Sequence, residues 1–241
     1  MGAVRLRADD GLSERIRELF DGISPHYDFM NHFLSMGTDK SWRRAAAIAA
    51  VMPKSEYSVL DVATGTADLA IEVYKQAAAR GKTVSITGMD FSNKMLEIAS
   101  KKVSALHISC ISLESGDALR MKYPDASFDV VTTAFSLRNF DDLGAFVAEV
   151  HRVLKSDGRF VFLEMAAPDS GAQRAFFSLY SVLMRAAGRL VRRGAYTWLV
   201  SSIKRFDKAR LMRMLTDAGF RNVERRNLVS GIAFIATGEK P

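Results

Sequence analysis

One segment of the chain combines the residue types and spacing of a nucleoside-binding loop. Residues 59–70 read Val-Leu-Asp-Val-Ala-Thr-Gly-Thr-Ala-Asp-Leu-Ala, an apolar run followed by small residues and then by a helix-compatible run. In such a strand–turn–helix, backbone N–H groups and the helix N-terminus approach a polar ligand closely, and Gly65 is expected at the tight turn. Asp90 closes the next apolar run 25 positions later, near the offset at which a carboxylate accepts both ribose hydroxyls. The pattern predicts a site for an adenosine-containing cofactor.

The loop favours S-adenosylmethionine over a dinucleotide. A dinucleotide fingerprint contains three glycines that admit a pyrophosphate, whereas here no second glycine follows Gly65 within the motif. Asp68, at the expected helix start, would repel a diphosphate and suits the cationic amino-acid end of S-adenosylmethionine. Asp61 is expected to orient the loop or that ammonium group, and Asp117, after a third strand, to accept a hydrogen bond from the adenine amino group. Each aspartate alone is equally typical of a cap or a turn, so the prediction depends on their joint occurrence at successive strand ends.

The elements around these residues alternate between strand and helix. Apolar or β-branched runs predict buried strands over 58–63, 84–90, 128–134 and 159–164, and helical stretches lie over 40–52, 68–79, 93–104, 142–154 and 208–218. Ser92 and Asp141 are expected N-caps. Two further runs, 222–229 and 231–237, are separated by one residue and predict an antiparallel hairpin at the sheet edge. The fold class expected is α/β with a mostly parallel sheet and helices on both faces.

Composition indicates an ordinary globular chain with an uneven charge. Its 241 residues are 48% hydrophobic and 25% charged, and the single cysteine, Cys110, cannot form an internal disulfide. Because the first ten residues lack an apolar core and no stretch is long enough to span a bilayer, we expect a cytoplasmic protein without a transmembrane helix. The net charge is +7, and residues 152–226 hold 16 Lys and Arg against 6 Asp and Glu. This asymmetry favours an anionic partner, although a solvated basic face is equally compatible with it.

Beyond the cofactor loop, particular motifs resemble the ubiquinone/menaquinone biosynthesis C-methyltransferases, over about residues 16–240. The segment 20–31, Phe-Asp-Gly-Ile-Ser-Pro-His-Tyr-Asp-Phe-Met-Asn, and the tripeptide Leu-Arg-Asn at 137–139 are the most specific of them. The other matching segments are 42–43, 64–68, 90–96, 152–155, 196–199, 202–203 and 218–220. The Gly-Thr-Ala-Asp form of the loop is similar to the menaquinone branch, which favours demethylmenaquinone as the substrate. Departures at Ser136, Ser156, Asp157 and Ala236 bear on substrate choice more than on the reaction.

The resemblance implies a Rossmann-like, class I S-adenosylmethionine-dependent methyltransferase with a mostly parallel seven-stranded sheet, an antiparallel last strand and an N-terminal helical cap. It implies one domain with a cap over 1–53, a cofactor-binding core over 54–166, a helical insert over 167–206 and a C-terminal helix and hairpin over 207–241. The residues expected to bind the cofactor are Asp61, Gly65, Thr66, Asp68, Asp90, Phe91, Met95, Asp117, Ala118 and Ala134. Those expected to be catalytic are Arg138, Asn139, Tyr27 and Asp28.

The implied chemistry is C-methylation of a polyprenyl quinol, most readily demethylmenaquinol to menaquinol. A ring carbon becomes nucleophilic when the neighbouring hydroxyl loses its proton, and a phenol with a pKa of about 10 is mostly neutral at pH 7. Arg138 is expected to stabilise the oxyanion directly or through a water, while Asn139 orients the same oxygen or water. Tyr27 and Asp28 would close the pocket from the cap. No metal is expected, because the four histidines and one cysteine lack ligand spacing.

The polyprenyl tail implied by the resemblance gives the basic C-terminal third a purpose. Residues 173–193 place aromatic and aliphatic side chains at helical spacing beside four arginines, which predicts an interfacial helix and peripheral membrane association. A helix packed over the active site, or one that forms a homodimer, fits the same pattern.

Three alternatives stay open from sequence. C-methylation of a 2-polyprenyl-6-methoxy-1,4-benzoquinol in ubiquinone biosynthesis uses the same chemistry. A non-catalytic cofactor-binding scaffold of a quinone-biosynthesis complex is disfavoured by the retention of Arg138 and the acids. An RNA methyltransferase fits the basic charge, but the chain lacks a basic stretch interleaved with aromatics, so no nucleic-acid partner is expected.

Overall fold

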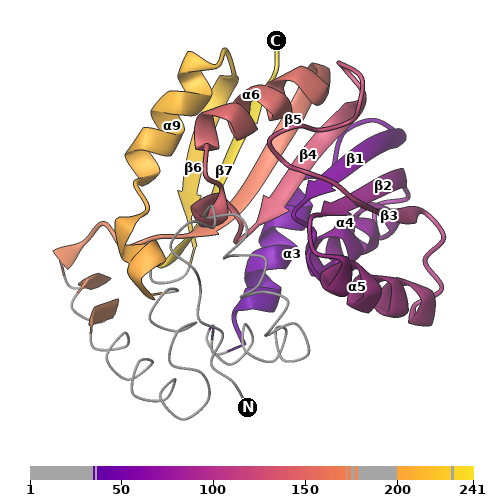
Figure 1. Cartoon of the computed structure of the whole chain (residues 1–241), viewed down its shortest axis with the longest axis horizontal. Helices are drawn as coiled ribbons and strands as arrows, with labels where there is room; N and C mark the ends of the chain where they lie inside the picture. The colour runs from indigo at the N-terminus through magenta and orange to yellow at the C-terminus, as the bar shows by residue number, and fades with distance from the viewer. Residues whose placement is uncertain (1–34, 36, 172, 175–176, 179–199, 229–230) are drawn as a thin grey trace, which may run out of the picture.

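The computed structural model describes residues 35, 37–171, 173–174, 177–178, 200–228 and 231–241. Within these ranges the chain forms one seven-stranded sheet in the order β3-β2-β1-β4-β5-β7-β6 (Figure 1). The strands are β1 (Glu56–Val62), β2 (Thr83–Asp90), β3 (Ile111–Ser115), β4 (Phe128–Ala134), β5 (Leu154–Met165), β6 (Arg221–Asn227) and β7 (Ala233–Glu239). The predicted α/β class with a mostly parallel sheet is confirmed.

Strands β1 to β5 are parallel, and β7 inserts antiparallel between β5 and β6. The predicted antiparallel hairpin is therefore present, but its one-residue connection is wrong. β6 ends at Asn227 and β7 begins at Ala233, so five residues connect them. The sequence prediction failed because Leu228 and Ile232 are apolar like a strand, whereas Gly231 at φ +69° belongs to the turn, in which its N–H donates to the Leu228 carbonyl at 2.8 Å.

The helices are α3 (Asp39–Ala49), α4 (Asp68–Ala78), α5 (Asn93–Ala105), α6 (Leu143–Val153) and α9 (Lys208–Asp217), with a 3-10 turn η2 (Leu137–Asn139) after β4. Helices α3, α4 and α5 share one hydrophobic cluster with the sheet, and α6 and α9 share another. Adjacent strand residues separate accordingly, since Val59 belongs to the first cluster and Leu60 to the second. In Figure 1 the two sets of helices cover opposite faces of the sheet.

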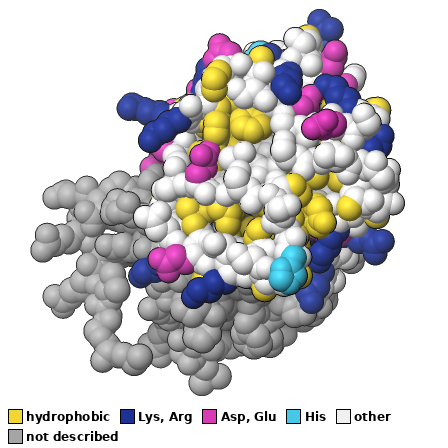
Figure 2. Space-filling model, turned by 90° about the vertical axis from the view of Figure 1, so that its right-hand side faces the viewer, with side chains coloured by type: hydrophobic (Ala, Val, Ile, Leu, Met, Phe, Trp, Pro, Cys, Tyr) yellow, Lys and Arg dark blue, Asp and Glu magenta, His cyan; other side chains and the backbone are white. Residues whose placement is uncertain are grey.

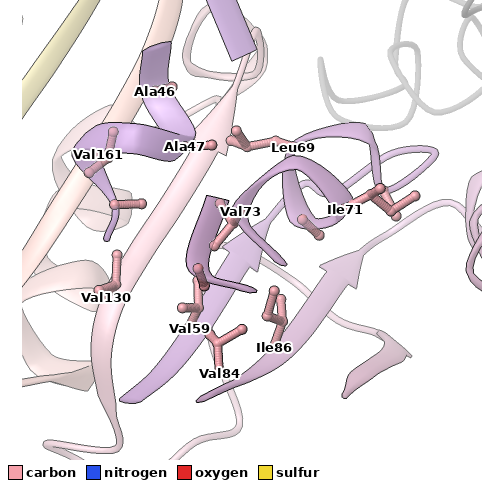
Figure 3. Packing of buried hydrophobic residues seen from close by; sticks show 14 of the residues in the cluster. Ala46, Ala47, Val59, Leu69, Ile71, Val73, Val84, Ile86, Val130 and Val161 are labelled. Atoms are coloured by element: carbon pink, nitrogen blue, oxygen red, sulfur yellow. The ribbon is translucent and has the colours of Figure 1, made fainter. Parts of the chain in front are cut away.

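Small side chains allow the first set of helices to pack closely on the sheet. Ala46 and Ala47 of α3 are fully buried, as is Val73 of α4. Figure 3 shows these side chains and those of Leu69 and Ile71 facing the strand residues of the same cluster, Val59, Val84, Ile86, Val130 and Val161. This packing fixes the N-terminus of α4, and hence the loop before it, against the ends of β1 and β2.

Helix starts follow the expected chemistry with one correction. The Ser92 side chain accepts from the Met95 N–H at 3.3 Å and caps α5, as predicted. The predicted cap Asp141 is wrong, because Asp142 holds that position and accepts from the Ala145 N–H at 2.9 Å. The sequence offers two consecutive aspartates, and the observed cap is the one with extended backbone, φ −129° and ψ 96°.

The two edges of the sheet are β3 and β6. β6 is exposed along nearly its whole length and carries Arg221, Glu224, Arg225 and Arg226. No helix in the described part of the chain is long and apolar enough to cross a membrane.

Candidate active site

The carboxyl ends of the parallel strands meet at one edge of the sheet, where the loops after β1, β2, β3 and β4 lie side by side. Backbone hydrogen bonds join these loops to neighbouring strands: the Thr64 N–H donates to the Met89 carbonyl at 3.0 Å, and the Gly116 N–H to the Asp90 carbonyl at 3.1 Å. In open α/β sheets this edge is the usual place for a ligand.

The loop after β1 has an unusual backbone. Ala63, Gly65 and Ala67 have φ of 52°, 56° and 65°, so left-handed residues recur at every second position. Alanine rarely adopts this conformation, and non-glycine residues in it concentrate at functional sites. Phe135, directly after β4, also has a positive φ of 61°. Three of the seven non-glycine residues with positive φ in the described part of the chain thus lie at the edge predicted to bind the cofactor.

The Asp61 carboxylate makes hydrogen bonds that hold the loop after β1. Its carboxylate is 1% exposed and accepts hydrogen bonds from the hydroxyls of Thr64 and Thr132, both at 2.6 Å. Burial raises its pKa to about 6, although these two bonds oppose the shift. Of the two roles expected for Asp61, the contacts favour orienting the loop.

Asp90 lies at the end of β2 with its carboxylate facing the loop. It is 5% exposed, and its two oxygens accept the N–H groups of Gly65 and Ser92 at 2.8 and 2.9 Å. A carboxylate oxygen accepts more than one hydrogen bond, so this fixed group is suited to ribose hydroxyls as well. Nearby, a Cβ on Gly88 would lie 2.9 Å from the Leu113 side chain and 3.0 Å from Thr64 Oγ1, so a larger residue there would displace these side chains.

Asp68, at the start of α4, is held by two cations. Its carboxylate lies 2.6 Å from Lys102 Nζ of α5 and 3.7 Å from Arg43 Nη2 of α3. Lys102 also donates to Thr66 Oγ1 at 3.0 Å. Sequence reasoning assigned Asp68 to an ammonium group and missed both cations. Arg43 also pairs with the buried Asp39 carboxylate at 2.5 Å, so two acids and two cations meet here. A cluster of both charges matches a zwitterion, the form of the amino-acid end of S-adenosylmethionine, better than an ammonium group alone.

The remaining predicted cofactor residues differ in their surroundings. Met95 is 2% exposed, whereas Phe91, Ala118 and Ala134 are half-buried at the ends of their strands. Asp117 is exposed, and its carboxylate accepts from the Leu119 N–H at 2.8 Å. The strand order places the loops of Asp117, Asp90, Gly65 and Ala134 in that sequence along the edge.

Arg138 and Asn139 follow β4 in η2, next to the cofactor loop. The Arg138 side chain is 3% exposed and its Nε donates to Glu164 Oε1 at 2.7 Å, in an ion pair that sequence reasoning did not identify. Glu164 is the acidic residue at the end of an apolar run, and that position was the available signal. Asn139 Oδ1 is buried without a hydrogen-bond partner among the described residues. A buried unpaired acceptor of this kind calls for a ligand or a water.

Several predictions fall outside the described residues. These are Tyr27 and Asp28, most of the N-terminal cap expected over 1–53, and most of the segment 173–193. The described part of the chain also contains a groove of about 560 Å³ between α5 and β3, lined by Ser100, Val103, Ser104, His107, Ile108, Ser109, Ile111 and Leu113. None of the predicted site residues lines it. On the side of the molecule where α5 and β3 lie in Figure 1, hydrophobic patches are surrounded by polar groups, with many Lys and Arg near the margin (Figure 2).

These groups suit a cofactor with a ribose and a zwitterionic end. Asp90 offers a buried carboxylate at the end of β2, and Asp68, Lys102 and Arg43 bring charges of both signs together at the start of α4. Arg138 and Asn139, in η2 after β4, provide guanidinium N–H donors and a buried amide oxygen without a partner among the described residues.

Comparison with known proteins agrees with this geometry. Residues 9–240 match the ubiE/COQ5 methyltransferase family. The chain is 47% identical over 232 residues to the demethylmenaquinone methyltransferase of Deinococcus radiodurans, covering 94% of this chain and 93% of that protein. It is 37% identical over 231 residues to the ubiquinone/menaquinone biosynthesis C-methyltransferase UbiE of Geotalea uraniireducens, covering 94% and 97%. Among solved structures, a SAM-dependent methyltransferase from Aquifex aeolicus has a TM-score of 0.54 at 18% identity, covering 76% of this chain and 81% of that one, a likeness in fold.

Proposed function

Because the chain belongs to the ubiE/COQ5 methyltransferase family, we propose that this S-adenosylmethionine-dependent enzyme methylates a ring carbon of a polyprenyl quinol. The preferred substrate is demethylmenaquinol and the product is menaquinol, as the name of the Deinococcus relative suggests. The benzoquinol of ubiquinone biosynthesis is the alternative, given the name of the Geotalea relative. The structural observation that carries the proposal is the buried Arg138 next to the unpaired Asn139 amide oxygen, beside the cofactor edge.

Asp90 and the loop around Gly65 hold the nucleoside, and Asp68, Lys102 and Arg43 hold the amino-acid end. Bound S-adenosylmethionine supplies an electrophilic methyl group on a sulfonium. The protein's task is then to align the ring carbon and to exclude water, and positioning of this kind contributes roughly 7–11 kcal/mol.

Arg138 and Asn139 promote the loss of the proton from the quinol hydroxyl. A guanidinium stays protonated in proteins, so Arg138 acts as a hydrogen-bond donor to the quinol oxygen as negative charge develops on it. The Asn139 amide oxygen accepts a hydrogen bond, either from the quinol hydroxyl or from a water that takes the hydroxyl proton. Deprotonation of the hydroxyl raises the electron density of the neighbouring ring carbon. That carbon would then bond to the methyl carbon as the S–CH₃ bond breaks, S-adenosylhomocysteine would leave, and the ring carbon would lose its hydrogen as a proton to water, which restores the aromatic ring.

Tyr27 and Asp28 are proposed to close the pocket above the ring, on the strength of the Tyr-Asp-Phe-Met-Asn motif alone. Their substitution by Phe and Asn tests this role in the assay below.

The test is methyl transfer from labelled S-adenosylmethionine to detergent-solubilised, chemically reduced demethylmenaquinol. We expect label in the quinone fraction, and a loss of about 100-fold or more with Arg138→Ala, because one oxyanion donor contributes about that factor. Arg159→Ala is the matched control, since Arg159 forms an Arg–Glu pair with Glu239 at 2.7 Å outside the site. It should retain activity.

A competing benzoquinol precursor in the same assay ranks the two ring systems. Cofactor binding without methylation of either quinol would overturn the proposal. A scaffold role would then be supported if partner proteins restore no activity, and an RNA enzyme if labelled RNA appears instead.

The location we propose is the cytoplasmic surface of the membrane, where a polyprenyl tail resides. Exposed basic side chains on α9, on β6 and before α9 support this proposal: Lys204, Arg205, Arg210, Arg213, Arg221, Arg225 and Arg226. Vesicle flotation should show binding to anionic but weaker binding to neutral phosphatidylcholine vesicles, and salt should weaken it. Equal recovery on both, independent of salt, would contradict an electrostatic contact. Light scattering of the same preparation tests the homodimer.

A further inference from the structure

Hydrogen bonds to three residues hold the Arg138 guanidinium in one orientation. Nε donates to Glu164 Oε1 of β5 at 2.7 Å, Nη1 donates to Ser202 Oγ at 3.2 Å, and Nη2 donates to the Phe135 carbonyl at 3.4 Å. The side chains of Arg138 and Glu164 are 3% and 0% exposed. Bonds to the described residues thus use three of the five guanidinium N–H donors, which fixes the direction of the other two.

Backbone N–H groups also hold the Glu164 carboxylate, apart from its ion pair with the Arg138 guanidinium. Its Oε1 also accepts the Met165 N–H at 2.7 Å, and its Oε2 accepts the Arg138 backbone N–H at 3.3 Å. β5 is also bonded on both sides, since Leu163 pairs with Ala134 of β4 and Glu164 pairs with Phe234 of β7. The Glu164 carboxylate therefore projects from the rigid backbone of the sheet, whereas Arg138 projects from η2, which is only a short turn.

A buried ion pair of this kind is a poor way to gain stability. The cost of removing both charges from water offsets much of their attraction, and apolar residues of similar size often serve stability equally well. Glu164 lies in a strand whose neighbouring residues, Phe160, Phe162 and Leu163, are fully buried and apolar. The pair is better explained by what it does to the arginine than by what it adds to folding.

We propose that Glu164 is the positioning residue for Arg138: through Nε it sets the guanidinium plane, so that the remaining N–H groups point at the substrate oxygen. Ser202 completes this arrangement from the segment that precedes α9. The inference rests on the proposed function for its reaction, but the orientation of Arg138 is a property of the protein alone. Since the pair is neutral overall, Arg138 stabilises the oxyanion through directed hydrogen bonds rather than through a net positive charge.

The main competing role for Glu164 is that of proton acceptor for the quinol hydroxyl. The two roles differ in what happens when the carboxylate becomes an amide. Glutamine keeps an oxygen that accepts the Nε–H but cannot take up a proton, so a positioning role survives in part and a proton-acceptor role does not.

The kinetic experiment compares Glu164→Gln with the wild type and with Glu239→Gln, the matched change in the Arg159–Glu239 pair, which has the same 2.7 Å separation. We expect Glu164→Gln to lower kcat about 10-fold, with KM for S-adenosylmethionine and the shape of the pH profile unchanged, since small misplacements of a catalytic group cost 10- to 100-fold. Glu239→Gln should leave kcat within about twofold of the wild type. Loss of one limb of the pH profile in Glu164→Gln would overturn the positioning role in favour of proton transfer.

A double-mutant cycle shows whether Glu164 acts through Arg138. Arg138→Lys keeps a cation beside Glu164 but lacks Nε–H, so the pair stays charge-balanced and the fold is preserved. In this background Glu164→Gln should lower kcat less than about twofold further. A further loss equal to that seen with Arg138 present would mean that the two residues act independently, and would overturn the proposal.

A readout without substrate separates this inference from the proposed function. In ¹⁵N-arginine-labelled protein, the Arg138 Nε–H should exchange slowly with solvent in the wild type, faster in Glu164→Gln, and at the rate of an exposed arginine in Glu164→Ala. If the wild type methylates no quinol but shows this series, the proposed function fails and the positioning role stands. If exchange is the same in all three proteins, Glu164 does not hold Arg138.

Discussion

Each end of the central strands buries a carboxylate, and the two carboxylates have opposite surroundings. Asp129, near the start of β4, is bonded by Lys54 Nζ at 2.5 Å, Lys155 Nζ at 2.8 Å and the Ser58 N–H at 2.9 Å. Asp61, near the end of β1, accepts from two threonine hydroxyls instead.

The electrostatic consequences also differ. Burial alone would raise the pKa of Asp129, but the bonds from Lys155 and Lys54 outweigh it and hold that pKa well below its ordinary value. The pKa of Asp61 is raised to about 6 by burial, and the neighbouring Asp90 carboxylate adds to the rise. One end therefore neutralises its buried charge with two ammonium groups. The other keeps negative charge on Asp61 and Asp90, which suits a cationic ligand.

Among the substitutions that test this difference between the two ends of the strands, we expect the largest effect from a change at Asp90. We expect Asp90→Ala to weaken S-adenosylmethionine binding at least ~100-fold, because charge-assisted hydrogen bonds contribute about 1.5–3 kcal/mol each and two are lost with the ribose. Titration calorimetry measures the affinity. Asp129→Ala, the matched change at the other end, should leave it unaltered, and similar losses in both variants would show that the distinction between the two ends is wrong.

A smaller effect concerns pH. The pKa of Asp61 is higher in the folded chain, so between pH 4 and 6 the unfolded chain ionises first and the free energy of unfolding should fall by roughly 2–3 kcal/mol as pH rises. The pKa of Asp129 is lower in the folded chain, so its stabilisation is present above about pH 4 and is lost as pH falls below that.

Urea unfolding from pH 3 to pH 8 separates the two groups. Asp61→Asn should remove the decline between pH 4 and 6, and Asp129→Asn should remove the acid-side loss. Parallel pH profiles for both variants and the wild type would mean that neither carboxylate has the surroundings described.

Most of the fold could be predicted from the sequence because its signals are local and agree with each other. The β4 bounds Phe128–Ala134 match the predicted strand, since an apolar run is bounded on both sides by turn-forming residues. The β6–β7 connection and the cap of α6 were mispredicted where two neighbouring residues offered similar signals. In the folded chain Gly231 lies in the turn and Asp142 caps α6, a result that depends on tertiary contacts.

The candidate site could be proposed from the sequence as a set of strand ends, but the partners of its side chains could not. Asp90 and Gly65 were identified together, and they are joined by a hydrogen bond. Glu164, Lys102 and Arg43 were missed because their partners lie far away in the sequence, and a charged residue in a strand or helix gives no local sign of which charge it meets.

The exposed edge strand β6 has a consequence for the protein in a crowded solution. An open edge offers unpaired backbone groups to any extended chain and is a starting point for aggregation. Arg221, Arg225 and Arg226 make this edge cationic, so a second copy adding its own β6 would bring like charges together. The same arginines that suit an anionic surface thus disfavour edge-to-edge pairing of two copies, although Glu224 and the Arg225–Asp169 ion pair offset part of their charge.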